Sequence, residues 1–397
     1  MDDKKILVIN SGSSSIKFQI ISLPKEKVLI KGLCDAIGQE HSKIIYEVDE
    51  KKKKGVMLKN HGVAIREIIK IIKEEGIVES LEELEGVGHR AVHGGEIFQK
   101  PSLITDELIK KMEEINHLAP LHNPPNVLGM RVFKKLAPTI KQVAVFDTAF
   151  HSKMPMHAYL YGLPIELYEE EGIRRYGFHG TSHHFVALKV SEIMGRDLKE
   201  LKIISCHLGN GASIAAIKDG KSIDTSMGLT PLEGLVMGTR CGDIDPAIPC
   251  FLQKEKGFSV DEVEKLMNKK SGLLGLSGIS PDMRLVKEEA LKGNKKAKTA
   301  REVYAYRVKK YIGAYIAAMN GLDAIVFTAG VGENEPLIRE MILEGLDNLG
   351  IEFDKSKNMD SREEISTESS KVRIFIIPTN EELMIARETI KVIEEEQ

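Results

Sequence analysis

The chain begins with short runs rich in apolar and β-branched residues, a pattern typical of β-strands. Three such runs lie at residues 6–9, 15–22 and 27–34, and a fourth lies at 43–48. Turn-forming residues, among them Pro24, separate the first three. We therefore expect a meander of neighbouring strands at the start of the fold.

A helical period follows this meander. One helical face is marked by Ile65, Ile68, Ile69 and Ile72, and the pattern ends at Gly76. A strand is expected at 87–92, a helix beginning near residue 105, and another strand at 143–146. Three strands followed by alternating helices and strands predict a mixed sheet with crossover helices.

The second half of the chain repeats this order. Strands are expected at 202–207, 212–218 and 221–225, with an Asp-Gly hairpin signal between the last two. A long helix at 296–320 and a buried strand that runs into a glycine-rich turn, at 323–334, come after them. The order βββαβαβα fits both halves, so we predict a duplicated α/β fold.

Length and composition agree with two globular domains. A chain of 397 residues exceeds the usual size of one hydrophobic core, and 42% hydrophobic with 29% charged residues is typical of a soluble protein. The net charge of -3 provides no general attraction for nucleic acid or anionic membranes, so any anion site has to be local. The basic run at 51–54 is expected to be a solvated loop.

Several features predict a cytoplasmic protein. The N-terminal residues lack the apolar stretch and cleavage site of a signal peptide. The most apolar tract, 311–332, is interrupted by polar residues and predicts a helix followed by a strand, not a membrane span. The cysteines lack CxxC spacing and are too few to stabilise a chain of this length through disulfide bonds, so we expect free thiols. These cysteines are Cys34, Cys206, Cys241 and Cys250.

The loop after the first strand has the composition of a phosphate-binding loop. Residues 10–17 read NSGSSSIK, with several hydroxyls, a glycine that lets the backbone come close, and the compact charge of Lys17. Asn10 ends the strand with a neutral oxygen that can ligate a hard cation. A similar loop follows the strand at 202–207. The alternative for the first loop is a plain hairpin with solvated hydroxyls. No GxxxxGK[ST] motif and no HRD or DFG set is present, which argues against the P-loop and protein-kinase folds.

Charged side chains at strand ends are candidates for catalysis. Arg90 ends one strand, and its guanidinium can hold a carboxylate or phosphate through two parallel hydrogen bonds. Asp147 ends another, where it can orient a cation, accept a proton or cap a helix. His89 and His93 are expected to be structural, because nothing supplies the rest of a metal site.

Two later segments supply further candidates. His179 is expected just before a helix as a donor to an anion, and a zinc site formed with the histidines at 183–184 is the alternative. Arg240 lies in segment 224–246, which is rich in Gly, Pro and Thr and too long for a simple turn. Its guanidinium can clamp an anion, or it can form an ion pair with one of the two aspartates that follow.

The last helix opens with the sequence PTNEELMIARE. With Thr379 as N-cap, Glu382 occupies the third helical position and completes a capping box. Glu381 is then left without a structural role, and its carboxylate can reach a metal ion.

Together these motifs resemble the acetate kinase family, part of the acetate and sugar kinase, Hsp70 and actin superfamily. Departures are slight: Ser11 stands where alanine or cysteine is also common, Cys241 where serine is frequent, and Val331 where isoleucine is frequent. None of them removes a charged group. The motifs, in the order of the family between residues 6 and 387, are NSGSSSIK, HRAVHGG, FDTAFH, YGFHGTSH, HLGNGAS, MGTRCGDIDP, TAGVGEN and PTNEELMIAR.

The resemblance implies two βββαβαβα domains of the actin-like ATPase, or ribonuclease H-like, fold with the active site in the interdomain cleft. The N-terminal domain would comprise residues 1–148 together with the C-terminal helix 381–397. The nucleotide-binding domain would comprise residues 149–380. The hinge is expected at the crossings near 147–151 and 377–381.

The resemblance also implies roles for single residues. Asn10 and Glu381 would hold Mg²⁺, with Mn²⁺ as an alternative, and Asp147 would be the acid/base or metal-orienting carboxylate. His179 and Arg240 would stabilise the transferring phosphoryl group. The catalytic set is Asp147, His179, Arg240 and Arg90; the substrate set is Arg90, Val92, Leu121, His122, Phe178 and Pro231. The nucleotide set is Lys17, His207, Leu208, Gly209, Asn210, Gly211, Asp282, Met283, Arg284, Gly330, Val331, Gly332, Glu333 and Asn334.

The implied activity is reversible, Mg²⁺-dependent, in-line phosphoryl transfer between ATP and acetate, which gives acetyl phosphate and ADP without a covalent enzyme intermediate. The partners would be these small molecules, not nucleic acid or membranes, and the family suggests a homodimer. A propionate or butyrate kinase is one alternative, because a methylene in an apolar pocket is worth only about 1–3 kcal/mol. An actin- or Hsp70-like ATPase is another, in which Arg90 and Arg240 would lack an obvious purpose.

Overall fold

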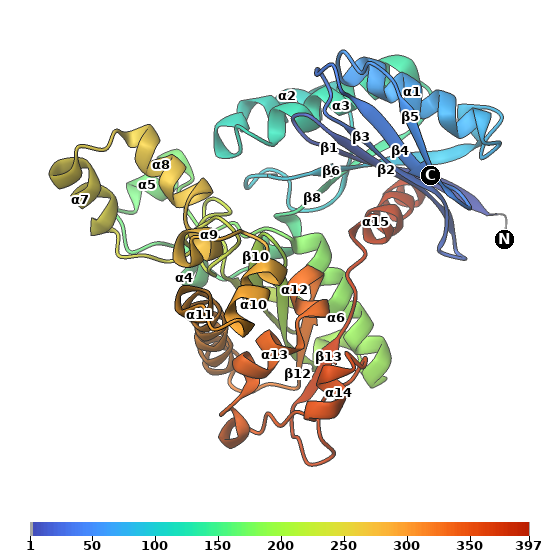
Figure 1. Cartoon of the computed structure of the whole chain (residues 1–397). Coiled ribbons are helices and arrows are strands. Elements are labelled where there is room, and N and C mark those ends of the chain that lie inside the picture. Colours follow the sequence, from blue (N-terminus) through green and yellow to red (C-terminus); the bar gives the residue numbers. More distant parts are fainter. Residues whose placement is uncertain (1–2, 397) are drawn as a thin grey trace. The chain divides into compact units, whose positions relative to one another are not determined.

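The computed structural model describes residues 3–396, and these form two compact units. Unit 1 comprises Met1–Ala149 and Asn380–Gln397, and unit 2 comprises Phe150–Thr379. Each unit is built around its own β-sheet (Figure 1). None of the helices in the described part of the chain is long and apolar enough to cross a membrane.

The sheet of unit 1 has eight strands in the order β5-β4-β3-β2-β1-β6-β8-β7. Strands β1 to β5 form an antiparallel meander, of which the first four strands were predicted, whereas β6 joins β1 and β8 joins β6 in parallel. The short β7 pairs with β8 and was not expected. The bounds are β1 Lys4–Ser11, β2 Ile16–Leu23, β3 Lys27–Asp35, β4 Lys43–Glu47, β5 Lys51–Gly55, β6 Leu84–Ala91, β7 Ser102–Leu103 and β8 Gln142–Phe146.

The basic run at 51–54 is wrong as a loop, because it forms β5 at the edge of this sheet. Its lysines are largely exposed, and they reach carboxylates of the neighbouring helix: Lys52 Nζ donates to Glu75 at 2.6 Å, and Lys54 Nζ to Glu67 at 3.3 Å. Lysines along an exposed edge oppose pairing with a further strand. The run is therefore solvated, as expected, but it is part of the fold.

Helices cover both faces of the sheet of unit 1. Alternate residues of β6 face opposite ways: Val87 belongs to the core that includes α1 and α3, whereas Gly86 and Gly88 face α15. A Cβ on Gly88 would lie 2.4 Å from Oγ1 of Thr389, so these glycines let α15 pack closely on the sheet. That contact also fixes the position of Glu381 at the start of the helix. The helices of unit 1 are α1 His61–Glu74, α2 Asp106–Glu114, α3 Asn123–Leu136 and α15 Glu381–Glu395.

The first turn of α15 differs from the predicted capping box. The N-cap is Asn380, whose side chain accepts a hydrogen bond from the amide of Leu383 at 2.9 Å. Thr379 precedes it and lies with its hydroxyl 2.7 Å from that of Ser182. Threonine and asparagine both cap helices well, which is why the pattern was misplaced by one residue. Glu381 and Glu382 consequently occupy the first helical turn, where the helix dipole favours carboxylates.

Ser11 is expected to lower the stability of unit 1. Its side chain is buried, and its hydroxyl has no hydrogen-bond partner among the described residues. Because a buried hydroxyl without a partner keeps its full desolvation cost, Ser11→Ala should raise the free energy of unfolding by about 1 kcal/mol in urea titrations. Ser42→Ala is the matched control, since the Ser42 hydroxyl accepts from Leu58 and donates to Val56. Equal destabilisation by both substitutions would contradict this account.

The sheet of unit 2 has five strands in the order β11-β10-β9-β12-β13. The first three form an antiparallel meander, while β12 joins β9 and β13 joins β12 in parallel. This is the connectivity of β3-β2-β1-β6-β8 in unit 1, so the predicted duplication is present in the topology. Strand β13 was not expected from the sequence. The bounds are β9 Lys202–Leu208, β10 Ala212–Lys218, β11 Lys221–Thr225, β12 Ala324–Thr328 and β13 Arg373–Ile376.

The apolar tract at 311–332 is a helix followed by a strand, as predicted. Helix α11 buries Tyr304, Val308, Tyr315 and Met319 on one face, and β12 is buried along its whole length. The helices of unit 2 are α4 Met156–Tyr159, α5 Glu166–Glu171, α6 Gly180–Met194, α7 Ala247–Lys256, α8 Val260–Lys269, α9 Gly272–Ser277, α10 Met283–Leu291, α11 Lys295–Met319, α12 Ala329–Asn334, α13 Pro336–Leu343 and α14 Lys355–Met359.

Candidate active site

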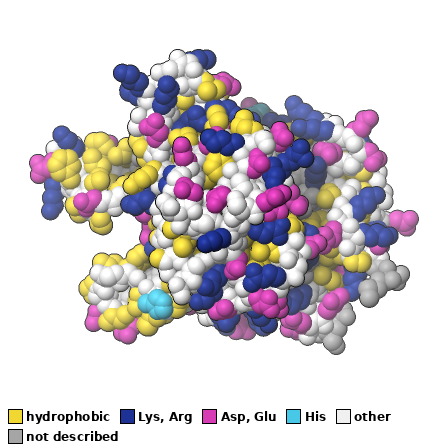
Figure 2. Space-filling model, turned by 90° about the horizontal axis from the view of Figure 1, so that it is seen from below, with side chains coloured by type: hydrophobic (Ala, Val, Ile, Leu, Met, Phe, Trp, Pro, Cys, Tyr) yellow, Lys and Arg dark blue, Asp and Glu magenta, His cyan; other side chains and the backbone are white. Residues whose placement is uncertain are grey.

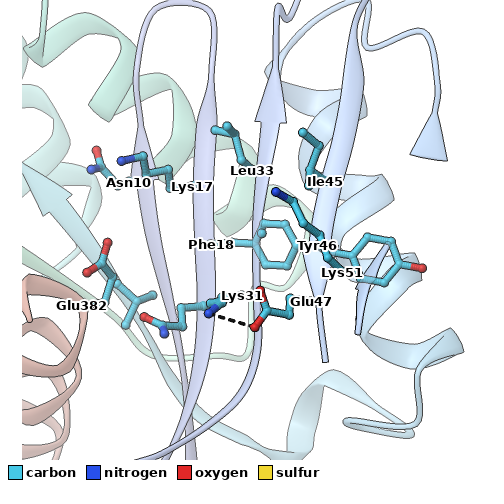
Figure 3. A pocket seen from close by; sticks show the side chains of 13 residues that line it. Asn10, Lys17, Phe18, Lys31, Leu33, Ile45, Tyr46, Glu47, Lys51 and Glu382 are labelled. Carbon is cyan, nitrogen blue, oxygen red and sulfur yellow. Dashed lines mark ion pairs between the residues drawn. The ribbon is translucent and has the colours of Figure 1, made fainter. Parts of the chain in front are cut away.

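Asn10 and Lys17 lie opposite each other at one end of the β1–β2 hairpin. They are partners in the antiparallel register, and with Glu382 they line a groove of about 410 Å³. Figure 3 shows the Lys17 amine pointing toward Asn10. The turn is closed by a hydrogen bond from the Gly12 amide to the Ser15 carbonyl at 2.8 Å. The hairpin thus presents an amide and an ammonium, and α15 a carboxylate, to one groove.

Arg90, Asp147 and Glu381 form a second cluster in unit 1. Arg90 lies near the end of β6 and Asp147 directly follows the neighbouring parallel strand β8. Arg90 Nε donates to Asp147 Oδ1 at 3.0 Å, and Nη2 donates to Oδ2 at 2.7 Å. Arg90 Nη1 lies 3.6 Å from Oε2 of Glu381. The bidentate pair therefore holds the guanidinium and the carboxylate in a fixed orientation.

The electrostatics of this cluster favour an added cation. Burial raises the pKa of Asp147 above its ordinary value; the charge of Arg90 opposes that rise, and Glu381 adds to it. Burial alone would lower the pKa of Arg90, but the two carboxylates raise it, so the guanidinium stays charged. Two carboxylates and one guanidinium carry a net charge of about -1 when ionised, which a divalent cation would compensate.

The oxygen donors of unit 1 fit Mg²⁺. The Asn10 amide and the Glu381 and Asp147 carboxylates are hard ligands of the kind this ion prefers. Within residues 3–396, no group of three or more His, Cys, Asp or Glu side chains is arranged to hold a metal. Mg²⁺ is usually held by only one or two carboxylates, with water and substrate phosphates completing its shell. A small donor set is therefore sufficient.

Two asparagines of α3 hold the strand-end loops of unit 1, and neither was identified from the sequence. Asn126 accepts from the Val92 amide at 3.1 Å and donates to the Ser11 carbonyl at 2.8 Å. Asn123 bonds both the amide and the carbonyl of His93, at 3.2 and 3.1 Å. One helical turn thus ties together the loops after β1 and β6. The signal was the segment NPPN at 123–126, with two asparagines spaced to share a helix face.

The residues of the predicted substrate set are divided between the two units. In unit 1, Val92 is half-buried after β6, while Leu121 and His122 are exposed before α3, Leu121 by 69%. In unit 2, Phe178 is buried and Pro231 is half-buried. His89, expected to be structural, is buried with Nε2 2.9 Å from the side-chain oxygen of Gln142.

His179, His207 and Arg240 gather around Gly211 in unit 2. His179 precedes α6, as predicted, with a φ of 56°, and its ring stacks on that of His207 at 4.2 Å. A Cβ on Gly211 would lie 3.5 Å from Nη1 of Arg240 and 3.6 Å from Cε1 of His179. The bare glycine therefore leaves room beside an arginine and a histidine, an arrangement suited to an anionic group.

Arg240 has no carboxylate partner in the part of the chain that the structure describes. Its Nη1 donates to the Pro231 carbonyl at 3.2 Å, and burial lowers the pKa of the guanidinium. The two following aspartates have other partners: Asp243 accepts from the Tyr311 hydroxyl at 2.7 Å, and Asp245 caps the start of α7. The ion-pair alternative is therefore wrong, and the charge of Arg240 is available to a ligand.

The zinc alternative is also wrong, because the histidines of α6 serve other contacts. His183 lies between two serines, with Nδ1 2.8 Å from Oγ of Ser205 and Nε2 2.8 Å from Oγ of Ser213. The ring of His184 stacks on Phe150 at 4.8 Å. A search of residues 3–396 finds no metal-binding group that contains them.

The three segments predicted to contact the nucleotide all lie in unit 2. His207 and Leu208 end β9 and residues 209–211 connect it to β10, with the Gly209 amide donating to the Gly211 carbonyl at 3.1 Å. Residues 330–334 form most of α12, which directly follows β12. Residues 282–284 begin α10, where Asp282 caps the helix.

Within α12, Glu333 supports the fold. Its Oε1 accepts from the amides of Ala329 at 2.7 Å and Thr379 at 3.3 Å. The fully buried Arg339 donates to the carbonyls of Gly332 and Glu333 at 2.8 and 3.0 Å. Arg339 lies outside the sequence motifs, so this contact could not be predicted from them. These bonds hold the backbone of the glycine-rich turn in place.

Fold and site together define a class of enzyme. The candidate residues are two arginines, two histidines and several oxygen donors, and they lie on two units whose sheets share one topology. Phosphoryl transfer depends on such positioned charges more than on covalent catalysis. The molecule therefore has the features of a phosphotransferase of the actin-like ATPase type.

The chain belongs to the acetokinase family, whose model matches residues 5–387. It is 56% identical over 395 residues to the acetate kinase of Dictyoglomus thermophilum, covering 98% of this chain and 99% of that protein. The crystal structure of Porphyromonas gingivalis acetate kinase superposes with a TM-score of 0.95 at 46% identity, covering 98% and 100% of the two chains. A propionate kinase from Francisella tularensis gives a TM-score of 0.93 at 43% identity, with the same coverage. The predicted fold class is thereby confirmed.

Proposed function

We propose that the protein is an acetate kinase, which transfers a phosphoryl group reversibly between ATP and acetate. The observation that carries this proposal is Arg240: a half-buried guanidinium beside His179 and Gly211, without a carboxylate partner among residues 3–396. A cation of this kind needs an anion in the working enzyme. Membership of the acetokinase family supports the phosphoryl group of ATP and acetyl phosphate as that anion.

We assign separate roles in binding and transfer to the charged residues. Arg90, fixed by Asp147, would bind the acetate carboxylate or its phosphoryl group, while Arg240 and His179 would stabilise charge on the equatorial oxygens during transfer. Acetate is itself a sufficient nucleophile, so the transfer is direct and in line. Lys17 and the loops at 207–211, 282–284 and 330–334 would contact ATP.

Mg²⁺ is part of this proposal. Asn10 and Glu381 would hold it, and Asp147 would orient it or act as an acid/base. When bound, the ion neutralises charge on the phosphates of the nucleotide. Mn²⁺ offers the same oxygen preference and is the expected substitute.

Trapping of acyl phosphates tests the activity and the choice of acid. The protein is incubated with MgATP and acetate, propionate or butyrate, and hydroxylamine converts any acyl phosphate to a coloured hydroxamate. We expect the highest kcat/KM for acetate, with propionate within about a hundredfold because one methylene separates them. The similarity to a propionate kinase makes that acid the second candidate. Absence of product from all three acids would overturn the kinase assignment.

We further propose that the protein is a homodimer that acts in the cytoplasm. Figure 2 shows hydrophobic side chains gathered on the projection at the left, where Figure 1 has α7 and α8. Exposed apolar side chains in such number favour an interface. The described cysteines are free thiols, which supports a reducing compartment. The exposed apolar residues of these helices and their flanks are Ile244, Ile248, Phe251, Phe258 and Val260.

Phe251→Glu tests the dimer. The side chain is 53% exposed on α7, so a charge there should leave the fold intact but oppose association. Light scattering after gel filtration should give the mass of two chains for the parent protein and of one chain for the variant. Tyr306→Glu, at an exposed position of α11, is the control and should remain dimeric. A monomeric parent protein, or a dimeric Phe251→Glu variant, would contradict the proposal.

A further inference from the structure

A series of hydrogen bonds connects His179 to three buried side chains. Nδ1 of His179 is 2.9 Å from Oγ of Ser213, and the same oxygen is 2.8 Å from Nε2 of His183. Nδ1 of His183 is in turn 2.8 Å from Oγ of Ser205. Ser213, His183 and Ser205 are completely buried. Water therefore does not compete for the two bonds of His183.

All four residues that make these hydrogen bonds are held in place by regular secondary structure. His179 and His183 are the N-cap and the fourth residue of α6, so they lie one helical turn apart. Ser213 belongs to β10 and Ser205 to its antiparallel neighbour β9. The distances are thus set by one helix packed on one hairpin, not by mobile side chains.

The N–H and O–H hydrogens in this series of hydrogen bonds have few possible arrangements. Burial lowers the pKa of His183 well below its ordinary value, and His151 and His207 lower it further, so His183 is neutral, with one donor and one acceptor. Either Ser205 donates to His183, His183 donates to Ser213 and Ser213 donates to His179, or every bond runs in the opposite direction. The first arrangement leaves the proton of a neutral His179 on Nε2, and the second leaves it on Nδ1.

The surroundings of His179 select the first arrangement. Arg240 and the Nε2 side of the His179 ring lie beside the same glycine, Gly211, where the proposed function places an anionic group. A neutral ring helps an anion only if it offers an N–H. With Nδ1 facing Ser213, that N–H has to be on Nε2.

We propose that Ser213 is a positioning residue for His179: backed by His183 and Ser205, its hydroxyl donates to Nδ1 and keeps the imidazole proton on Nε2. This inference rests on the proposed function, in which His179 donates to the transferring phosphoryl group. Ser213 does not touch the substrates. It sets the orientation and the tautomer of a residue that does.

Ser213→Ala should reduce kcat by about 10-fold to 100-fold, the usual loss when a supporting hydrogen bond of a functional histidine is removed. The KM values for ATP and acetate should change little, because the substrate contacts remain. Ser213→Thr restores the hydroxyl and should recover most of the loss. Ser226→Ala is the matched control: this serine is equally buried, but its hydroxyl accepts from the Ile214 amide and touches no histidine. Normal kcat in Ser213→Ala, or equal losses in the Ser213 and Ser226 variants, would overturn the proposal.

Nitrogen NMR of the histidine-labelled protein gives a readout that is independent of activity. The signals of His179 are assigned by their loss in His179→Gln. We expect the parent protein to carry the proton on Nε2 and Ser213→Ala to show a mixture of both tautomers. A proton on Nδ1 in the parent protein would refute the proposal. If acyl phosphate formation fails but the Nε2 tautomer is found, the proposed function is wrong and the role of Ser213 in setting the tautomer stands.

Discussion

Arg240→Ala should lose most of its turnover while it continues to bind ATP. The guanidinium has no carboxylate partner among residues 3–396, so its removal leaves no buried charge uncompensated, and the fold should persist. The Pro231 carbonyl and the Met237 sulfur each lose a donor. Removing one positioned donor to the charge of a transition state typically lowers kcat on the order of a hundredfold or more. Steady-state kinetics measures the loss, and calorimetry with MgADP measures nucleotide affinity.

Arg240→Lys provides the matched comparison for this substitution. Lysine keeps the charge but loses the planar fork, so activity should lie between that of the parent protein and that of the alanine variant. Thermal unfolding of all three proteins establishes whether the fold is retained. Near-normal turnover of Arg240→Ala would remove Arg240 from the mechanism.

Asp147→Asn should give the second large effect. Asparagine has nearly the same shape but lacks the charge that fixes Arg90 and that a bound cation needs. Glu381, 3.6 Å from Arg90, still provides a counter-charge, so the variant should fold. We expect kcat to fall on the order of a hundredfold or more, within the range for loss of a positioned acid/base group. Titration of activity with Mg²⁺ should also show a higher requirement for the ion.

Glu381→Gln separates the two roles proposed for Asp147. If Asp147 mainly orients the metal, both variants should require more Mg²⁺, and excess ion should restore part of their activity. If Asp147 mainly transfers a proton, only the Glu381 variant should recover. Unchanged kcat and unchanged Mg²⁺ dependence in Asp147→Asn would exclude both roles.

Local patterns predicted much of this fold. Short apolar runs located the strands that carry Asn10 and Arg90, and the expected start of α6 placed His179 correctly. These features depend on neighbours in the sequence. The basic run at β5 was misassigned because four consecutive lysines do not alternate, although an edge strand tolerates them.

The supports of the site could not be predicted in the same way. Asn126 bonds residues 34 and 115 positions away, and Ser213 meets His179 across 34 positions. No local period encodes such pairs, because each depends on how a helix packs on a sheet. The same limit applies to Arg240: whether an arginine faces an aspartate or a ligand is decided by the path of a long loop.

The stereochemical course of the transfer tests the central claim most directly, namely that positioned charges, and no enzyme nucleophile, move the phosphoryl group. ATP made chiral with oxygen isotopes at the γ-phosphorus is converted with acetate, and the configuration of the acetyl phosphate is determined. A single in-line transfer predicts inversion at phosphorus. Retention would require a phosphorylated enzyme intermediate and would contradict the account.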